Sequence, residues 1–321
     1  MERATTTAGD QAAYGRLVDL LRGGDITVLT GAGLSTESGI PDYRGPDGKR
    51  RVAPMTYGEF VGSPESRQRY WARSFVGWRR FAGATPNDGH HAVADLQGLG
   101  LVRAIITQNV DGLHQRAGAH DVLELHGNLA LVRCLQCGER TPRAELDLRL
   151  SEANPHFAGT SAGTLSATLE DELAGGIRPD GDVVLSDEAV ASFHPPRCLV
   201  CESDLLKPDV VFFGEPVPRT VVDQAYSSVE ASSGLLVLGS SLQVMSGYRF
   251  VRRAASNGIP VAIVTRGPSR GDAEATIRLD VTLGVTLSRI VQDLTLPAGG
   301  SDLAQHRGDL AQDGGVISVD G

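Results

Sequence analysis

The four cysteines of this chain form two pairs with the same spacing. Cys134 and Cys137 make one C-x-x-C motif, and Cys198 and Cys201 make the other. Two such pairs supply the four thiolates of a closed tetrahedral zinc site, which holds a fold together and does no chemistry. A single pair could be a redox couple, and four buried thiols without a metal are the simpler alternative. We favour one structural zinc ion per chain.

A second set of residues suited to chemistry follows an apolar, β-branched run at 25–30. Gly31 and Gly33 come directly after this run, which has the character of a buried parallel strand. Such a turn lets the backbone approach a pyrophosphate and directs amide N–H groups at its charge. The usual dinucleotide fingerprint fails twice, because Thr36 replaces the third glycine and two arginines at 50–51 replace the ribose-binding acid. The loop therefore predicts nucleotide binding, but not of a dehydrogenase's kind.

Polar side chains continue the pattern around a turn at 39–41. They are Ser35, Glu37, Ser38, Asp42, Tyr43 and Arg44. A solvated loop could carry the same residues. The whole stretch 31–45, GAGLSTESGIPDYRG, resembles the NAD-binding signature of the sirtuins. Three further segments resemble sirtuin motifs in the same order, namely QNVDGLH at 108–114, ELHG at 124–127 and GSSLQV at 239–244. The resemblance runs from about residue 14 to about residue 293.

The order of the expected elements gives the fold that positions these motifs. Helical spacing alternates with apolar runs that are predicted to be strands, at 25–30, 101–107, 209–213, 235–238, 261–264 and 277–281. This alternation predicts an α/β fold, a Rossmann-like doubly wound parallel sheet covered on both faces. Ligands bind such sheets at the carboxyl ends of the strands. Gly31, Gln108, Gly239 and Thr265 each fall just past a predicted strand, so one cleft is expected to collect them.

The chain is expected to divide into two structural units. Residues 14–128 and 207–293 would form the Rossmann-like NAD-binding domain, and 129–206 would form a smaller inserted zinc-binding lobe. The 60 residues between the two cysteine pairs are too many for a simple zinc ribbon, which indicates an inserted substructure. The ends, 1–13 and 297–321, are expected to be disordered.

Two stretches are expected to be less regular than the sheet. Residues 56–82 are rich in aromatic side chains and predict helices that form a partly mobile cover over the site. Residues 155–185 are rich in Gly, Ser, Thr and Ala and predict a long loop.

The resemblance implies NAD-consuming deacylation, in which an acylated lysine and NAD give free lysine, nicotinamide and an O-acyl-ADP-ribose. A base must take a proton from a ribose hydroxyl, and histidine suits that task at neutral pH. His126 is the candidate by its place in the ELHG motif, although a lone histidine after a strand is more often structural. The resemblance assigns Asn109 to the ribose and its water, Asp111 to the nicotinamide carboxamide, and Gln108 to the ribose side. Without the resemblance, these three residues would be interpreted as a polar turn.

The resemblance assigns further residues to the NAD site. Those of the first loop, for the phosphate and the nicotinamide ribose, are Gly31, Ala32, Gly33, Ser35, Asp42, Tyr43 and Arg44. Those of the second loop and the adenosine half are Gly239, Ser240, Ser241, Thr265, Arg266, Gly267 and Leu283. The segment 265–267 departs from the Asn-x-Gly of most of the family.

A substrate strand is also implied. Val211, Phe213, Gly214 and Glu215 resemble the family's strand that pairs with an extended peptide, although an ordinary buried strand fits equally well. Segments 69–78 and 206–214 resemble the class II branch, which leaves the acyl preference open.

One pair of residues suggests an acidic acyl group. Tyr70 and Arg73 lie three residues apart on one face of a predicted helix. They resemble the Tyr-x-x-Arg pair of class III sirtuins, in which the planar guanidinium binds both oxygens of a carboxylate. Packing within an aromatic helix is the alternative interpretation.

Composition limits the partners. The formal charge of −9 and the pI of about 5.4 give no electrostatic footprint for nucleic acid and suit a basic protein segment. No apolar run approaches the roughly 18 residues that span a bilayer, and the first ten residues lack a signal-peptide pattern. We expect an acylated-lysine protein or peptide as partner, no nucleic acid, no membrane, and a cytoplasmic location.

Three functions use the same motifs. The prediction is an NAD-dependent protein-lysine deacylase with a structural zinc ion. The first alternative is an NAD-dependent protein mono-ADP-ribosyltransferase, which would pass the ribosyl group to a protein nucleophile. The second is a non-enzymatic NAD- or ADP-ribose-binding zinc protein, and the presence of both His126 and Asn109 argues against it.

Overall fold

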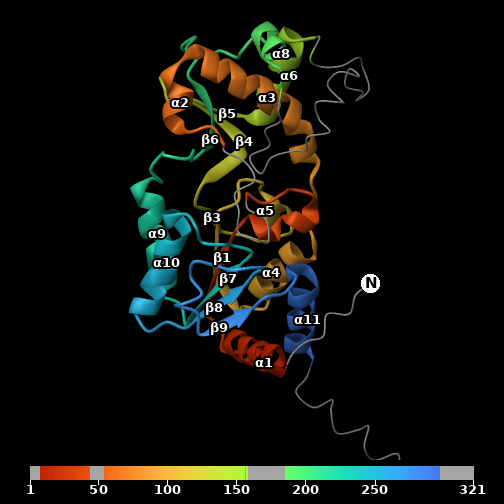
Figure 1. The fold of residues 1–321 in the computed structure, drawn as a ribbon, viewed down its shortest axis with the longest axis vertical. Coiled ribbons are helices and arrows are strands. Elements are labelled where there is room, and N and C mark those ends of the chain that lie inside the picture. The colour runs from red at the N-terminus through yellow and green to blue at the C-terminus, as the bar shows by residue number, and fades with distance from the viewer. Residues whose placement is uncertain (1–7, 44–53, 156, 158–184, 297–321) are drawn as a thin grey trace, which may run out of the picture.

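Two lobes of unequal size make up the described part of the protein. The computed structural model describes residues 8–43, 54–155, 157 and 185–296. A parallel sheet between helices forms the larger lobe, and a small antiparallel sheet with its own helices forms the other (Figure 1). No helix within these ranges is long and apolar enough to cross a membrane.

The sheet of the larger lobe has six parallel strands within the described residues, in the order β3-β2-β1-β7-β8-β9. Their bounds are β1 Ile26–Thr30, β2 Val102–Thr107, β3 Val122–Glu124, β7 Gly234–Leu238, β8 Val261–Val264 and β9 Ile277–Leu279. Every residue of β1, β7 and β8 is buried, as strands covered on both faces require. The winding reverses between β1 and β7, and open α/β sheets bind ligands at such a switch point.

Helices cover both faces of this sheet, because alternate residues of each strand point to opposite sides. The helices are α1 Ala8–Arg22, α4 Asp88–Gly98, α9 Arg219–Glu230, α10 Met245–Ser256 and α11 Leu283–Thr295. Helices α1, α4 and α11 lie on one face of the sheet and α9 and α10 on the other (Figure 1). Leu236 and Leu238 of β7 belong to the hydrophobic cluster of the first face, and Leu235 and Val237 to that of the second. The predicted Rossmann-like, doubly wound parallel sheet is confirmed.

The smaller lobe is built on a second, antiparallel sheet with the order β5-β4-β6 in the described chain. Its elements are β4 Gly127–Cys134, β5 Arg140–Pro142, β6 Leu206–Val210, α2 Tyr57–Gly62, α3 Pro64–Gly83, α6 Arg143–Ala153 and α8 Asp187–Ser192. One hydrophobic cluster joins these elements, with Phe60, Trp71, Val132 and Phe193 at its centre. The lobe therefore has a core of its own.

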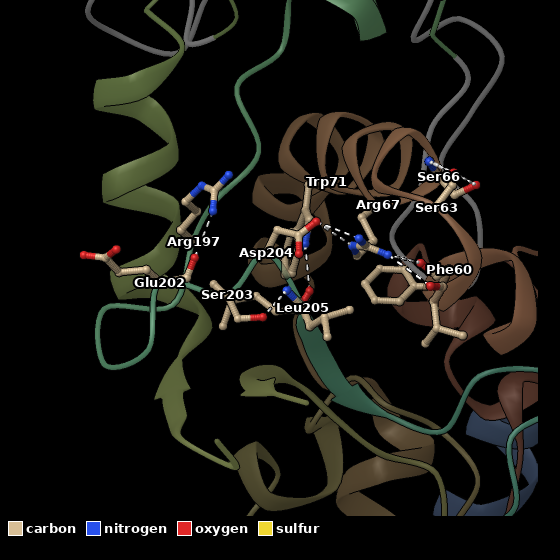
Figure 2. Close-up of polar contacts among 12 residues, drawn as sticks. Phe60, Ser63, Ser66, Arg67, Trp71, Arg197, Glu202, Ser203, Asp204 and Leu205 are labelled. Atoms are coloured by element: carbon tan, nitrogen blue, oxygen red, sulfur yellow. Dashed lines mark hydrogen bonds and ion pairs between the residues drawn. The ribbon is translucent and has the colours of Figure 1, made fainter. Parts of the chain in front are cut away.

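Helix α3 is fixed to the smaller lobe by polar contacts as well as by packing (Figure 2). Ser63 caps the helix by accepting a hydrogen bond from Ser66 N, and Pro64 begins its first turn. Trp71 Nε1 donates to the Leu206 carbonyl of β6 at 3.0 Å, and Arg67 Nη2 lies 2.6 Å from Asp204 Oδ2. These bonds tie α3 to the segment that follows the second cysteine pair.

The prediction that 56–82 forms a partly mobile cover was wrong. Phe60 and Trp71 are among the most buried side chains of the protein, at 0% and 1% exposed. The aromatic residues are needed because the three-stranded sheet is small and its apolar face has α2 and α3 as partners. An aromatic-rich helix cannot be assigned to a cover or to a core from its own residues.

The prediction of a parallel-sheet strand at 209–213 was also wrong. The chain forms β6 at Leu206–Val210, which pairs antiparallel with β4 in the smaller sheet. The run was assigned to the large sheet because an apolar strand does not reveal which sheet it joins. As a result, 57–83 and 206–210 pack with the lobe that was placed at 129–206.

The structure tests the prediction for the start of the chain but not for its end. Helix α1 begins at Ala8, so the expected disordered start at 1–13 was too long. The expected disordered end at 297–321 lies outside the described residues. Most of the expected loop at 155–185 also lies outside them.

Candidate active site

A cavity of about 1100 Å³ opens at the carboxyl ends of the parallel strands and is lined by residues of both lobes. Residues that follow β1, β2, β7 and β8 line it, among them Gly31, Gln108, Gly239 and Thr265. These are the four residues that were expected to share one cleft, so that prediction is confirmed. The volume is at the upper end of the roughly 300–1,000 Å³ of ordinary small-molecule sites, so the cavity is large enough for a ligand of dinucleotide size.

The loops after β1 and β7 touch backbone to backbone. Gly33 N donates to the Gly239 carbonyl at 2.8 Å. A Cβ added to Gly239 would lie 2.7 Å from Gly33 C and closer still to Leu34 N, and Gly239 has a φ of 61°. A Cβ added to Gly31 would meet the Cβ of Ser240 at 2.8 Å. The glycines are therefore required by the contact between the loops, whatever they do for a phosphate.

The first loop is folded as two short 3-10 turns, η1 (Ala32–Leu34) and η2 (Thr36–Ser38). Gly39 ends the second turn in the left-handed region, with a φ of 81°. Glu37 then reaches helix α11, where its Oε1 accepts a hydrogen bond from Gly284 N at 3.1 Å. A carboxylate at a helix N-terminus is favourable, and this one joins the loop to the start of α11.

Asn109 and Asp111 meet at Ser35. The Asn109 side-chain amide donates to Ser35 Oγ and to the Gly31 carbonyl, both at 3.1 Å. Ser35 Oγ in turn donates to Asp111 Oδ2 at 2.7 Å. Burial raises the pKa of Asp111, and the bonds from Leu113 N and Ser35 oppose that change. Ser35 is therefore the residue at which the side chains of Asn109 and Asp111 meet.

A buried hydroxyl network lies below Asn109. Thr30 Oγ1 is 2.8 Å from Thr107 Oγ1 and 3.0 Å from His114 Nε2, and Asn109 N donates to Thr107 Oγ1 at 3.1 Å. Burial lowers the pKa of His114 to about 4, so this ring is neutral at pH 7. His114 thus supports β1 and β2 at the floor of the site.

His126 has both ring nitrogens engaged at the cavity wall. Nδ1 lies 2.8 Å from the Gln108 carbonyl, and Nε2 lies 2.9 Å from Ser246 Oγ. A carbonyl can only accept, so Nδ1 carries the proton and Nε2 keeps a lone pair. Burial lowers the pKa of His126; the bond to Gln108 opposes this change, and the charge of Arg249 adds to it. The ring is therefore a neutral base at pH 7.

The expected substrate strand continues from β6 along the cavity. Val211 N donates to the His126 carbonyl at 2.8 Å, and the Phe213 carbonyl accepts from Tyr57 N at 2.9 Å. Glu215 Oε2 accepts from Phe212 N at 2.9 Å and from Lys207 Nζ at 3.0 Å. Glu215 thus holds the turn of its own segment, with a buried lysine as its partner.

Nearly all of the expected NAD and substrate residues line this cavity. Those that do are Gly31, Ala32, Gly33, Ser35, Asp42, Tyr43, Gln108, Asn109, Asp111, His126, Gly239, Ser240, Ser241, Thr265, Arg266, Leu283, Val211, Phe213, Gly214, Glu215 and Tyr70. Gly267 and Arg73 are not in the lining, and Arg44 lies outside the described residues. The Tyr70 ring packs 5.3 Å from the rings of Phe60 and Phe212, so it is part of an aromatic cluster.

The four cysteines come together away from this cavity, at one end of the smaller sheet. All four sulfur atoms lie within 4.8 Å of one another. Sγ of Cys134 is 3.6 Å from that of Cys201, and Sγ of Cys137 is 3.7 Å from that of Cys198. Tetrahedral zinc with Zn–S bonds of about 2.3 Å sets its sulfurs about 3.8 Å apart, whereas a disulfide needs about 2.05 Å. The thiol set therefore fits one zinc ion.

Several residues of the site were not predicted. Ser246 and Arg249 line the cavity from the first turns of α10. Glu37 was noted only as a polar residue of the first loop, and its contact with α11 was not expected. His90 lies with its ring 5.2 Å from that of His114, under Ser35. Ser246 follows the 239–244 motif by two residues, so its position in the chain was a signal. Its contact with a histidine 120 residues away was not.

A parallel sheet with a switch-point cavity between two glycine loops, joined to a lobe with four clustered thiols, defines a Rossmann-type nucleotide-binding protein with a zinc lobe. A sequence model described as the Sir2 family matches residues 31–246. The chain belongs to the Sir2 family.

Named relatives and solved structures agree with this assignment. The chain is 51% identical over 289 residues to a Streptomyces coelicolor protein named NAD-dependent protein deacetylase 1, covering 90% of this chain and 92% of the relative. A Mycobacterium avium protein of the same name is 48% identical, with 87% and 95% covered. A structure titled "Sir2-p53 peptide-NAD+" is 30% identical with a TM-score of 0.65, covering 87% of this chain and 97% of that one.

Gly239→Ala should separate the loop contact from ordinary glycine strain. The matched control is Gly258→Ala, because Gly258 has a similar φ of 71° but open space at its Cβ. We expect the control to lower the free energy of unfolding by about 1 kcal/mol, and Gly239→Ala to lower it by about 3 kcal/mol or more. Urea unfolding of both variants measures the difference. Equal losses would show that the loops do not depend on this contact.

Cys198→Ser should remove the metal and stability together. We expect about one zinc per chain in the wild type, almost none in the variant, and a thermal midpoint lower by at least about 5 °C, because structural zinc contributes folding free energy directly. Elemental analysis and thermal unfolding are the measurements. Leu199→Ala, an exposed neighbour in the same knuckle, is the control. A metal-free wild type would exclude the zinc site.

Proposed function

We propose that this protein is an NAD-dependent protein-lysine deacylase of the deacetylase type. The observation that carries the proposal is His126, a neutral base whose Nε2 lone pair is placed at the wall of the cavity that both glycine loops line. Relatives of about half identity over most of the chain bear the name NAD-dependent protein deacetylase. The products would be free lysine, nicotinamide and an O-acyl-ADP-ribose.

The residues around the cavity fit a dinucleotide. Bound NAD would supply an electrophilic ribose carbon and nicotinamide as the leaving group. Gly31, Ala32 and Gly33 would hold it at the first loop, and Gly239 and Ser240 at the second. The cavity crosses the switch point between β1 and β7, where sheets of this topology bind dinucleotides.

Asn109 and Asp111 would position the nicotinamide end. Their side chains are fixed by Ser35, and Asn109 is also bonded to the Gly31 carbonyl. Polar side chains held in this way lose little freedom on binding, so they can discriminate an amide by paired hydrogen bonds. Gln108 donates to Ser240 Oγ at 3.0 Å and so joins this group to the second loop.

An acylated lysine of a protein or peptide is the proposed second substrate. The segment 211–215 lines the cavity and is held by Tyr57 and Lys207, which gives a peptide a fixed strand to lie beside. Solved neighbours carry titles that name a p53 peptide and a myristoylated histone peptide. These neighbours support a peptide substrate without choosing its acyl group.

A panel of acyl-peptides incubated with NAD tests the proposal by mass spectrometry. Deacylation gives the free-lysine peptide together with O-acyl-ADP-ribose. A protein that gains an ADP-ribosyl group would identify a transferase instead. NAD binding without release of nicotinamide would identify a binding protein.

His126→Ala should remove the proposed base. We expect turnover to fall by about 10²- to 10⁴-fold, with NAD affinity and thermal midpoint close to those of the wild type. Steady-state kinetics, calorimetry and thermal unfolding measure these quantities, and the control is His91→Ala on the exposed side of α4. A well-folded His126→Ala protein with full activity would falsify the assignment.

Arg73→Met should leave the acyl preference unchanged. Tyr70 lines the cavity but is packed among aromatic rings, and Arg73 is not in the lining, which argues against the two acting as a carboxylate-binding pair. We expect the ratio of succinyl- to acetyl-peptide turnover to stay within about twofold of the wild-type ratio. Arg69→Met, an exposed residue of the same helix, controls for the lost charge. A selective loss of succinyl-peptide turnover would restore the acidic-acyl role.

A further inference from the structure

The base has a second partner that the proposed reaction does not account for. Because Nδ1 of His126 donates to the Gln108 carbonyl, Nε2 is the nitrogen that must take a proton. That nitrogen already accepts a hydrogen bond from the Ser246 hydroxyl at 2.9 Å. The lone pair needed for catalysis is therefore occupied by a side chain of the protein itself.

Ser246 is placed by a rigid element. It is the second residue of α10, which packs on the sheet through the buried Phe250, Val251 and Ala254. The next residue, Gly247, lies against the Gln108 side chain, and a Cβ there would come within 2.8 Å of Gln108 Cδ. Both hydrogen-bond partners of His126 are thus parts of one packed unit.

Two kinds of group near His126 affect its protonation, namely the charged side chains and the Ser246 hydroxyl. Arg249, one turn after Ser246, lines the same cavity and disfavours the protonated ring. The carboxylates on the neighbouring elements are bonded elsewhere: Glu124 to Gln115 and Asn128, Asp111 to Ser35, and Asp209 to Arg140. The Ser246 hydroxyl can donate to Nε2 of the neutral ring or, after rotation, accept from Nε2–H of the protonated ring, and the second bond is the stronger because it is charge-assisted.

We propose that Ser246 is a positioning residue for the base, resting on the deacylase function proposed above. Its hydroxyl holds the Nε2 lone pair of His126 in one orientation. When substrate binds, the substrate hydroxyl replaces the serine as the hydrogen-bond partner of Nε2, and the ring takes the proton of that hydroxyl. When the substrate replaces it, the O–H bond of the substrate breaks, the Nε2–H bond forms, and the serine keeps its own proton. Ser246 therefore sets both the direction and the basicity of His126.

The test compares Ser246→Ala with Ser246→Thr, which keeps the hydroxyl. Loss of the oxygen that can accept from the protonated ring should lower the pKa of His126 by about 0.5 to 1 pH unit in Ser246→Ala. Since the base must be neutral, the acid limb of the kcat profile should move to lower pH by the same amount. Turnover on the pH-independent plateau should nevertheless fall by about three- to tenfold because the ring is no longer held in one orientation, with KM for NAD within twofold, and Ser246→Thr should restore most of the loss.

Ser256→Ala is the matched control, because Ser256 lies on the same helix and bonds only to the Arg253 carbonyl. The pKa of His126 is read by NMR titration of histidine-labelled protein, with His126→Ala identifying the signal. This reading does not depend on turnover: a wild type without activity would refute the deacylase function, yet the titration would still report on Ser246. An unchanged pKa and an unchanged acid limb in Ser246→Ala would overturn the inference.

Discussion

The contact between the loops after β1 and β7 is the constraint on which the site depends. Gly33 and Gly239 approach closely enough that a single Cβ would collide with backbone. Because β1 and β7 are neighbours in the sheet, this contact brings two stretches about 200 residues apart to the same edge. Each loop begins a different βα half of the fold. The cavity can cross the switch point because the halves meet there without side chains between them.

Gln108 connects the two loops to His126, the proposed base. Its side-chain amide donates to the Thr30 carbonyl and to Ser240, which belong to the first and second halves of the sheet. Its backbone carbonyl fixes the tautomer of His126, and its side chain packs against the first turn of α10. A displacement of either loop would therefore change the position of Gln108 and, through it, of His126. A neutral amide suits this position because it can donate to both oxygens. A charged side chain would donate as well, but its buried charge would have no opposite charge beside it.

Local pattern was sufficient for the parts of the fold that depend on local physics. The strands β1, β7 and β8 are buried on both faces and so consist mainly of apolar and β-branched residues, and the two C-x-x-C pairs need only short-range geometry to form knuckles. Local pattern failed where the place of a segment depends on which distant element it packs against. The predicted strand at 209–213 fits either sheet, and the aromatic face of α3 fits a cover as well as a core. The bonds of Ser246 and Glu37 join residues more than 100 positions apart, so their spacing carried no signal.

The scarcity of lysine in the chain can be related to the position of Lys207 in the structure. The protein has 28 arginines and two lysines, Lys49 and Lys207, and Lys49 lies outside the described residues. Lys207 is 4% exposed, its ammonium bonded to Glu215 and to the Val210 carbonyl and set 4.7 Å from the Phe212 ring. An acyl group on that nitrogen would remove its charge and break the ion pair with Glu215. Among its described residues, an enzyme that acts on modified lysines thus presents no exposed lysine of its own.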